Sequence, residues 1–214
     1  MDNINNKRIR YYSVWLSLVC VLVFIIQNII PGFTETFYLT QDALTRPWQF
    51  LTAIFLHGSV AHLLYNIFAL ILFGIMLETI IWSKKFLGLF LISGILANIA
   101  SFHFYSASLG ASGAIMAILG CLAVLRPLMT VWAFNLPMPM FIAALLWVGG
   151  SVLGIFGFGD QSTGHLAHLS GIVLGVCYGF YLRFRYRNKN QAGFTQKIVL
   201  DENSMRKWEE GYLR

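Results

Sequence analysis

Two short stretches combine a hydroxyl or an imidazole with glycines at the start of a long apolar run. Gly110-Ala-Ser-Gly113 precedes one run, and Gly164-His-Leu-Ala-His-Leu-Ser-Gly171 opens another. Serine is a weak nucleophile until a positioned base takes its proton, and histidine can do this near neutral pH. The residue types therefore indicate Ser112 as a candidate nucleophile and His168 as its candidate general base.

The composition is typical of a membrane protein. Of the 214 residues, 57% are hydrophobic and only 11% are charged, which is too little charge for the exterior of a soluble domain. Apolar runs of about 20 residues can cross the ~30 Å hydrocarbon core of a bilayer as helices. Such runs occur at residues 13–30, 59–82, 86–105, 112–126, 138–157 and 165–183. We therefore expect an all-α membrane protein with six transmembrane helices.

The basic residues indicate how these spans are oriented. The net charge is +6, and the basic residues at the span ends fall on one side of the membrane, whereas Arg46 is the only base in the opposite loops. By the positive-inside rule, both termini are expected to be cytoplasmic. Because the basicity sets the topology, we expect a multi-pass protein of the cell membrane and no nucleic-acid partner.

The expected organisation is a cytoplasmic N-terminus at residues 1–12, one six-helix domain at 13–187 and a cytoplasmic polar tail at 188–214. The first span follows basic residues and resembles a signal peptide in that respect. No small-residue cleavage site precedes Pro31, however, and five more spans follow. We therefore expect the first span to be retained.

Helical rise allows the depth of the polar side chains to be compared. At about 1.5 Å per residue, Ser112 lies roughly 21 Å above the cytoplasmic end of its span, and His168 roughly 22 Å above the end of its own. Both are then about 8 Å beneath the outer edge of a ~30 Å core. Asn66 lies roughly 25 Å up, with His62 one turn higher. Polar groups are costly in lipid, so four of them in one outer layer of the membrane indicate a functional site.

This layer contains the parts of a hydrolytic site. The span at residues 112–126 begins at Ser112, so unpaired backbone N–H groups and the positive end of a helix dipole lie beside the Ser112 hydroxyl. Such amides can stabilise an oxyanion, and Gly110 and Gly113 would allow a tight turn and a close backbone approach. His62 and Asn66 share one helix face and could donate further hydrogen bonds. No Asp or Glu lies at this depth, so we expect a Ser–His dyad rather than a triad.

Small residues at helical spacing line one face of each span that carries Ser112 or His168. They are Gly113, Ala117 and Gly120 in the span that carries Ser112, and Gly171, Gly175 and Gly179 in the span that carries His168. Such faces let two membrane helices approach closely. If the two faces meet, they bring His168 towards Ser112.

Each of these features also has a purely structural interpretation. Ser112 could simply cap its helix, since serine is a preferred N-cap residue. The glycine faces could serve only to pack helices, and the His62–Asn66 pair could be a structural hydrogen bond between helices. His57 and His103 are expected to be interfacial or solvated, because they lie near the ends of their spans.

The remaining ionisable side chains in the spans are expected to be structural. Glu78 lies a turn before a basic segment and is expected to reach the cytoplasmic surface. Three cysteines lie inside apolar runs and are expected to be small core residues: Cys20, Cys121 and Cys177. The histidines gather on one side, which leaves a metal-binding or transport protein as an alternative. The chain lacks His-Glu-x2-His and a carboxylate at that depth, so we expect no metal and no cofactor.

The ordered set of these residues resembles the rhomboid intramembrane serine proteases in their minimal six-helix form. The matching motifs are His57-x4-His62-x3-Asn66, Gly110-x-Ser112-Gly113 and Ala167-His168-x2-Gly171-x3-Gly175. The resemblance covers about residues 13–185. It implies that Ser112 is the nucleophile, that His168 is the general base, and that His62, Asn66 and the Ser112 backbone amide form the oxyanion hole. It also implies that the span at 138–157, with its adjoining outer loop, gates substrate entry and that the 31–58 loop lies partly in the membrane.

The chain departs from the family pattern at three places. Many members carry Trp-Arg in the first outer loop, where this chain has Trp48-Gln49. Many also carry a tyrosine under the catalytic histidine, at the position of Met116 here. His165, three residues before His168, is also unusual. None of these differences removes a group that the resemblance implies to be catalytic.

The resemblance implies a serine endopeptidase that cleaves transmembrane segments of other membrane proteins near the extracytoplasmic face. Its partners would be such substrates, with small or helix-destabilising residues near the cut site, and membrane lipid. Those residues are expected because a helical peptide bond is shielded by its own hydrogen bonds. The alternative is a catalytically silent, rhomboid-like binder of membrane clients.

Overall fold

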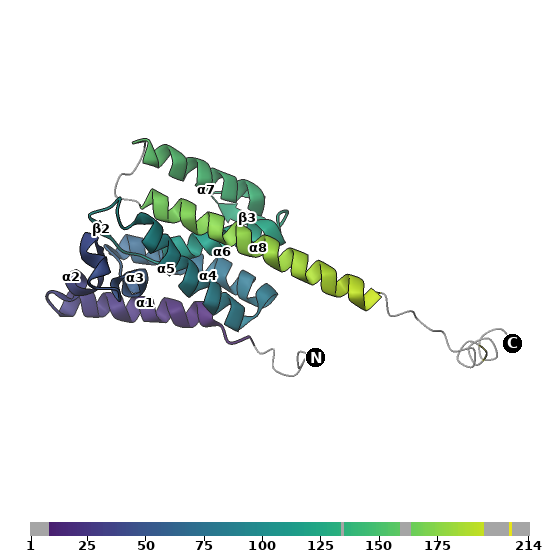
Figure 1. Cartoon of the computed structure of the whole chain (residues 1–214), viewed down its shortest axis with the longest axis horizontal. Helices are drawn as coiled ribbons and strands as arrows, with labels where there is room; N and C mark the ends of the chain where they lie inside the picture. Colours follow the sequence, from purple (N-terminus) through teal and green to yellow (C-terminus); the bar gives the residue numbers. More distant parts are fainter. Residues whose placement is uncertain (1–8, 134, 159–163, 195–205, 207–214) are drawn as a thin grey trace. The chain divides into compact units, whose positions relative to one another are not determined.

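The protein is mostly helical, as the apolar runs predict. The computed structural model describes residues 9–133, 135–158, 164–194 and 206. Its six long helices are α1 (Tyr12–Ile29), α4 (Val60–Ile81), α5 (Ser83–Ser101), α6 (Ser112–Leu125), α7 (Met140–Ile155) and α8 (His165–Phe194) (Figure 1). Most of residues 1–12 and the tail from 195 onward, Arg206 apart, lie outside the described residues.

Within the described part of the chain, four helices are long and apolar enough to cross a membrane, namely α1, α4, α5 and the His165–Tyr186 part of α8. The helices α6 and α7 are apolar but shorter. With 14 residues, α6 is about 21 Å long, which is less than the ~30 Å thickness of a hydrocarbon core. The chain forms two compact units, Met1–Phe180 and Tyr181–Arg214. The candidate site lies in the first unit.

The short helix α6 forms the core of this unit. Every residue from Gly113 to Leu122 is buried, and α6 contacts α4, α5 and α7. Large apolar side chains on the outer faces of α1 and α7 are instead exposed, among them Trp15, Leu22 and Leu145. A buried central helix surrounded by helices with exposed apolar faces is the arrangement expected in lipid.

The segment between α1 and α4 is a compact structure of short elements. These are α2 (Phe33–Phe37), β1 (Leu39–Thr40), a 3-10 helix (Gln41–Leu44), α3 (Gln49–Thr52) and a second 3-10 helix (Ala53–Phe55). β1 pairs antiparallel with β2 (Ala107–Ser108), which precedes α6. The loop has its own small core of Leu39, Ala43, Ala53 and Phe102. It is thereby joined to the segment that carries Ser112.

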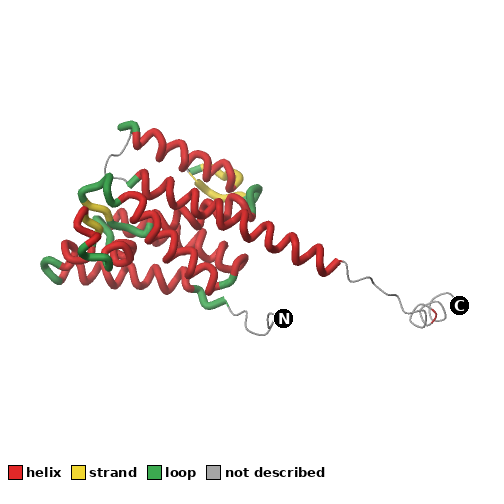
Figure 2. Tube along the Cα trace, in the orientation of Figure 1, coloured by secondary structure: helices red, strands yellow, loops and turns green. Residues whose placement is uncertain are grey.

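The expected all-α class is confirmed as a mostly helical protein, which also contains short antiparallel strand pairs. A second antiparallel pair, β3 (Thr130–Ala133) and β4 (Leu136–Pro139), connects α6 to α7. Figure 2 shows the two small sheets at opposite ends of the helices. The prolines in β4 cannot donate backbone hydrogen bonds, so this segment is extended and α7 begins only at Met140.

The expectation for Glu78 was also wrong, because its side chain is fully buried rather than at the surface. Its carboxylate accepts hydrogen bonds from the backbone N–H of Tyr12 at 2.9 Å and from the N–H and hydroxyl of Ser13 at 3.1 Å each. These donors belong to the first turn of α1, whose N–H groups have no partner within the helix. Burial is stabilising here because the carboxylate caps a neighbouring helix.

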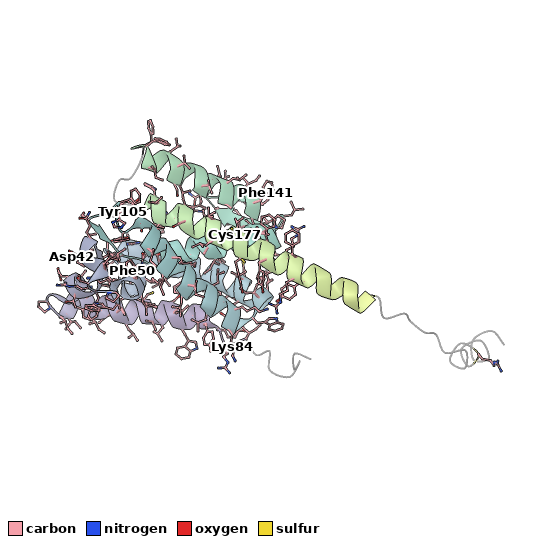
Figure 3. All side chains as sticks on the ribbon, in the orientation of Figure 1. Asp42, Phe50, Lys84, Tyr105, Phe141 and Cys177 are labelled. Atoms are coloured by element: carbon pink, nitrogen blue, oxygen red, sulfur yellow. The ribbon has the colours of Figure 1, made fainter. Side chains whose placement is uncertain are left out.

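One of the three cysteines also differs from the expectation. Cys20 and Cys121 are buried core residues, whereas Cys177 is exposed on α8. Figure 3 labels Cys177 on that helix. Its step of two from Gly175 and Gly179 turns it away from the glycine face, so it was wrong to place it in the core.

Candidate active site

Ser112 and His168 are in hydrogen-bond contact. Ser112 Oγ lies 2.8 Å from His168 Nε2. Ser112 is the first residue of α6, and Ala111 occupies the N-cap position without a side-chain hydrogen bond. The alternative in which Ser112 only caps the helix is therefore not what the structure contains. Its hydroxyl lies beside the imidazole and beside the unpaired N–H groups of the first helical turn.

The position of His168 depends on how α8 begins. His168 lies in the first turn, is only 7% exposed, and donates its backbone N–H to Gly164 O at 3.1 Å. The hydroxyl of Tyr105 accepts the N–H of Leu166 at 3.0 Å, which satisfies one of the unpaired donors at the helix start. Figure 3 labels Tyr105 at this end of the bundle. A residue from the loop before α6 thus holds the start of the helix that carries His168.

The glycine faces of α6 and α8 are in direct backbone contact. A Cβ atom at Gly171 would collide with the carbonyl oxygen of Gly113, and one at Gly175 with that of Ala117. From the other side, a Cβ at Gly120 would lie 2.5 Å from Ile172 O. Side chains at these positions would push the helices apart. The close approach that the spacing suggested is therefore present, and it sets the distance between Ser112 and His168.

His62 lies across Gly110 from the hydroxyl. A point at the Cβ position of Gly110 is 2.9 Å from His62 Nε2 and 4.0 Å from Ser112 Oγ. Gly110 has a φ of +125°, which residues with a side chain rarely adopt. The Gly110 N–H donates to Ala53 O at 2.9 Å, and this bond joins the segment before α6 to the segment between α1 and α4. Glycine is thus required at 110 by backbone conformation and by the space that His62 occupies.

Asn66 is buried one turn below His62 on α4. Its Nδ2 donates to His62 O at 2.8 Å, and its Oδ1 has no partner among the described residues. An amide nitrogen has two hydrogens, so one N–H is not used by this bond. Ser59 caps α4 and accepts the His62 N–H at 3.1 Å. The bond expected between helices at His62–Asn66 is in fact made within one helix.

His57 was expected to be interfacial or solvated, and that expectation was wrong. The ring is 1% exposed, and neither ring nitrogen has a partner in the described part of the chain. It meets the His62 ring edge-on, with centroids 5.1 Å apart. Burial, and secondarily the proximity of His62, lower the pKa of His57 to about 4. The ring is therefore neutral and supports His62 by packing. His103, by contrast, is exposed.

Three polar residues that brace the site were not identified from the sequence. Gln27 accepts the His57 N–H at 3.0 Å and donates to His57 O at 3.3 Å. Gln49 is completely buried and accepts the N–H and hydroxyl of Thr40. Tyr105 is the third. Polarity within an apolar stretch is the signal that could have found Gln27. Gln49 begins the short helix α3 and Tyr105 lies in the loop before α6, outside the long apolar helices, where polar residues are common.

His165 and Met116 both lie close to the helix that carries His168. The His165 imidazole packs directly on Gly154 of α7, where a Cβ atom would collide with the ring. The same ring meets His168 edge-on, with centroids 6.4 Å apart. Met116 is buried, and a Cβ at Gly171 would lie 3.2 Å from its own Cβ. Among the described residues, no cluster of three or more His, Cys, Asp or Glu has the geometry of a metal site.

Comparison with known proteins identifies the family. A family model described as the Rhomboid domain matches residues 44–185, which is more than half of the chain. The chain belongs to the rhomboid family. The matched region contains the whole of the candidate site, from His57 to His168, and the rhomboid resemblance of the motifs is confirmed. Together with its apolar helices, this makes the protein a mostly helical, multi-pass membrane protein.

The chain is similar in sequence to rhomboid proteins from plants, yeast and bacteria. RHOMBOID-like protein 6, mitochondrial, from Arabidopsis thaliana is 32% identical over 157 residues, which are 68% of this chain and 49% of that protein. Rhomboid protein 1, mitochondrial, from Saccharomyces cerevisiae is 31% identical, over 67% of this chain and 44% of that protein. Rhomboid protease GlpG from Haemophilus influenzae is 29% identical, over 77% of this chain and 87% of that protein. The chain thus spans about half the length of the two mitochondrial relatives and most of GlpG.

Proposed function

We propose that this rhomboid is an intramembrane serine endopeptidase that hydrolyses peptide bonds in or near transmembrane segments of other membrane proteins. The observation that carries the proposal is the 2.8 Å contact between Ser112 Oγ and His168 Nε2. The two residues lie at the starts of two helices whose separation is set by backbone contact. Membership of a family that includes a named rhomboid protease supports the same conclusion.

In the first half of the proposed reaction, His168 Nε2 takes the hydroxyl proton of Ser112 as Oγ attacks the scissile carbonyl carbon. The carbonyl π pair moves to oxygen and forms a tetrahedral oxyanion. His168 then donates its proton to the amine nitrogen as the C–N bond breaks. The amine product leaves, and the acyl group remains as an ester on Ser112 Oγ.

In the second half, water attacks the ester carbonyl while His168 Nε2 takes a proton from it. The tetrahedral intermediate collapses when the bond to Ser112 Oγ breaks, and His168 returns its proton to that oxygen. The carboxylic acid product leaves and the dyad is restored. No carboxylate is required in this scheme, because the imidazole is held by the packing of α8 on α6 and by the Tyr105 hydroxyl at the helix start.

The proposed oxyanion hole consists of the Ser112 backbone N–H, His62 and Asn66. Two observations support it. His62 Nε2 and Ser112 Oγ flank the same point above Gly110, and the Ser112 amide is in the unpaired first turn of α6. Asn66 would contribute the N–H that its bond to His62 O leaves unused. Donors of this kind stabilise the charge that develops in the transition state, each by about 3–4 kcal/mol.

The proposed setting is the cell membrane, with both termini in the cytoplasm and the site opening to the extracytoplasmic side. The core domain would be residues 13–187, followed by the cytoplasmic tail at 188–214. The short length of α6 supports a site below the outer membrane surface, because the helix ends before it could reach both faces. Substrates would be transmembrane segments with small or helix-destabilising residues near the cut site, entering where α7 moves.

The test is proteolysis by the purified full-length protein in lipid vesicles, with cut sites on single-span proteins mapped by mass spectrometry. Ser112→Ala and His168→Ala should each abolish cleavage, while thermal melting shows that they remain folded. Ser170→Ala is the matched control, since the Ser170 hydroxyl only donates to Ala167 O within α8. Cleavage by purified Ser112→Ala would refute the proposal.

A serine-directed fluorophosphonate distinguishes the protease from a silent binder of membrane clients. The proposed enzyme should be labelled at Ser112, and labelling should disappear in Ser112→Ala but persist in Ser170→Ala. A folded protein that binds single-span proteins but is neither labelled nor able to cleave them would favour the binder.

A further inference from the structure

A groove lies between α5 and α8 on the side of the bundle, separate from the Ser–His contact. Its volume is about 280 Å³. The residues that define it are Lys85, Gly88, Ile92 and Leu96 on α5, with Leu174 and Tyr178 on α8. On α5 these positions follow a helical stripe of about three turns, so the groove runs along the helix for about 16 Å.

Gly88 leaves space in the groove because it has no side chain. A Cβ atom built at Gly88 meets nothing within 4 Å, so the space beside it is unfilled by the protein. The Ser93 hydroxyl donates to Leu89 O at 2.6 Å and so presents no unsatisfied donor to the groove. The lining is therefore apolar along its length, apart from the end at Lys85 and the Tyr178 phenol.

Basic groups gather at one end of the groove. Lys84 and Lys85 are exposed in the first turn of α5, and Figure 3 shows Lys84 pointing outward from the bundle. The backbone N–H of Arg10 donates to Ser83 Oγ at 2.8 Å, which places a third basic residue at the same helix end, and the Arg10 guanidinium donates to the Tyr12 hydroxyl at 3.4 Å. The first N–H groups of α5 add the positive end of a helix dipole. This end therefore favours an anion.

We propose that the groove binds an anionic phospholipid, with one acyl chain along the apolar stripe and the phosphate beside Lys85. The apolar walls cannot by themselves select this ligand, because surrounding lipid tails are equally apolar. Selectivity comes from the headgroup, since each basic residue near an anionic lipid changes affinity by about fivefold. The site is independent of the proposed proteolysis and does not share its residues.

The test uses the full-length chain in phosphatidylcholine vesicles that contain a trace of photoreactive lipid. The probe is either phosphatidylglycerol or phosphatidylcholine with a diazirine at the end of one acyl chain, and cross-links are mapped by mass spectrometry. Phosphatidylglycerol should label the α5–α8 groove about tenfold more than phosphatidylcholine. Lys85→Gln should lower phosphatidylglycerol labelling about fivefold and leave phosphatidylcholine labelling unchanged.

Filling the groove provides the second arm of the experiment. Gly88→Leu places a side chain in the open space and should remove groove labelling by both probes. Gly149→Leu on α7 is the matched control, because a Cβ there also meets nothing within 4 Å. Fluorophosphonate labelling of Ser112 or thermal melting verifies folding of each variant, and Lys85→Gln tests the site if Gly88→Leu does not fold. Equal labelling by the two lipids, or loss of labelling when a single-span protein is added, would overturn the proposal.

Discussion

Gly171 of α8 lies directly on the carbonyl oxygen of Gly113, one residue after Ser112. No Cβ atom fits between them, so the two backbones are as close as packed helices can be. This contact is one helical turn from His168 and adjacent to Ser112. The distance between Ser112 Oγ and His168 Nε2 is therefore set by the absence of a side chain at 171.

Replacing that glycine should separate the dyad. In Gly171→Ala, the new methyl group would force α8 away from α6, at a cost of about 1–3 kcal/mol in stability. A displacement of about 1 Å in a reacting group can lower the rate about 100-fold. We expect kcat to fall by that order in the vesicle cleavage assay. Gly149→Ala, at an open position on α7, should retain activity. Full activity in Gly171→Ala would show that the contact does not position His168.

The hydroxyl of Tyr105 should affect catalysis through α8. Tyr105→Phe removes the acceptor for the Leu166 N–H and should cost about 1–2 kcal/mol in stability, because a donor at the helix start loses its partner. The start of α8 carries His168, so we expect kcat to fall about tenfold with little change in KM. Tyr65→Phe is the control, since Tyr65 is 76% exposed on α4. Equal activity of the two variants would contradict the role given to Tyr105.

Buried His57 should make stability depend on pH. Its pKa is about 4 in the folded protein and about 6.5 in the unfolded chain, so the unfolded chain binds the proton first as pH falls. The resulting stability is present above about pH 6.5 and is lost towards pH 4, by up to about 3 kcal/mol. His57→Phe should flatten the pH dependence of thermal melting between these values. His103→Phe, at an exposed position, should melt like the parent protein, and an unchanged slope in His57→Phe would refute the prediction.

The contact between His165 and Gly154 predicts coupling between α7 and His168, the proposed general base. Gly154→Ala would place a methyl group where the His165 ring lies and should push that ring against His168. We expect kcat to fall about tenfold. Gly150→Ala, four residues earlier in an open position, should be silent. The double variant Gly154→Ala/His165→Ala removes the collision and should recover activity relative to Gly154→Ala. Independent, additive effects of the two substitutions would exclude the coupling.

The helices and the family could be read from the sequence because their physical signals are local. Apolar runs predicted the six helices to within a few residues at most ends, since hydrocarbon requires a continuous apolar surface and internally satisfied backbone groups. Glycine spacing and the estimated depth of the polar residues indicated Ser112 and His168 as candidate site residues. The expectations that failed, for Glu78, His57 and Cys177, concerned side chains whose burial depends on partners far away in the chain.

The sequence alone determined the helices, their small-residue faces and the residue types available for chemistry. The tertiary structure decided which groups meet: Ser112 with His168 at 2.8 Å, Tyr105 with the start of α8, and His165 with Gly154 of α7. It also showed that the segment between α1 and α4 holds the segment before Ser112, through the pairing of β1 with β2 and the hydrogen bond from Gly110 N–H to Ala53 O. Periodicity along one segment specifies which face is apolar, but only packing between distant segments specifies what that face touches.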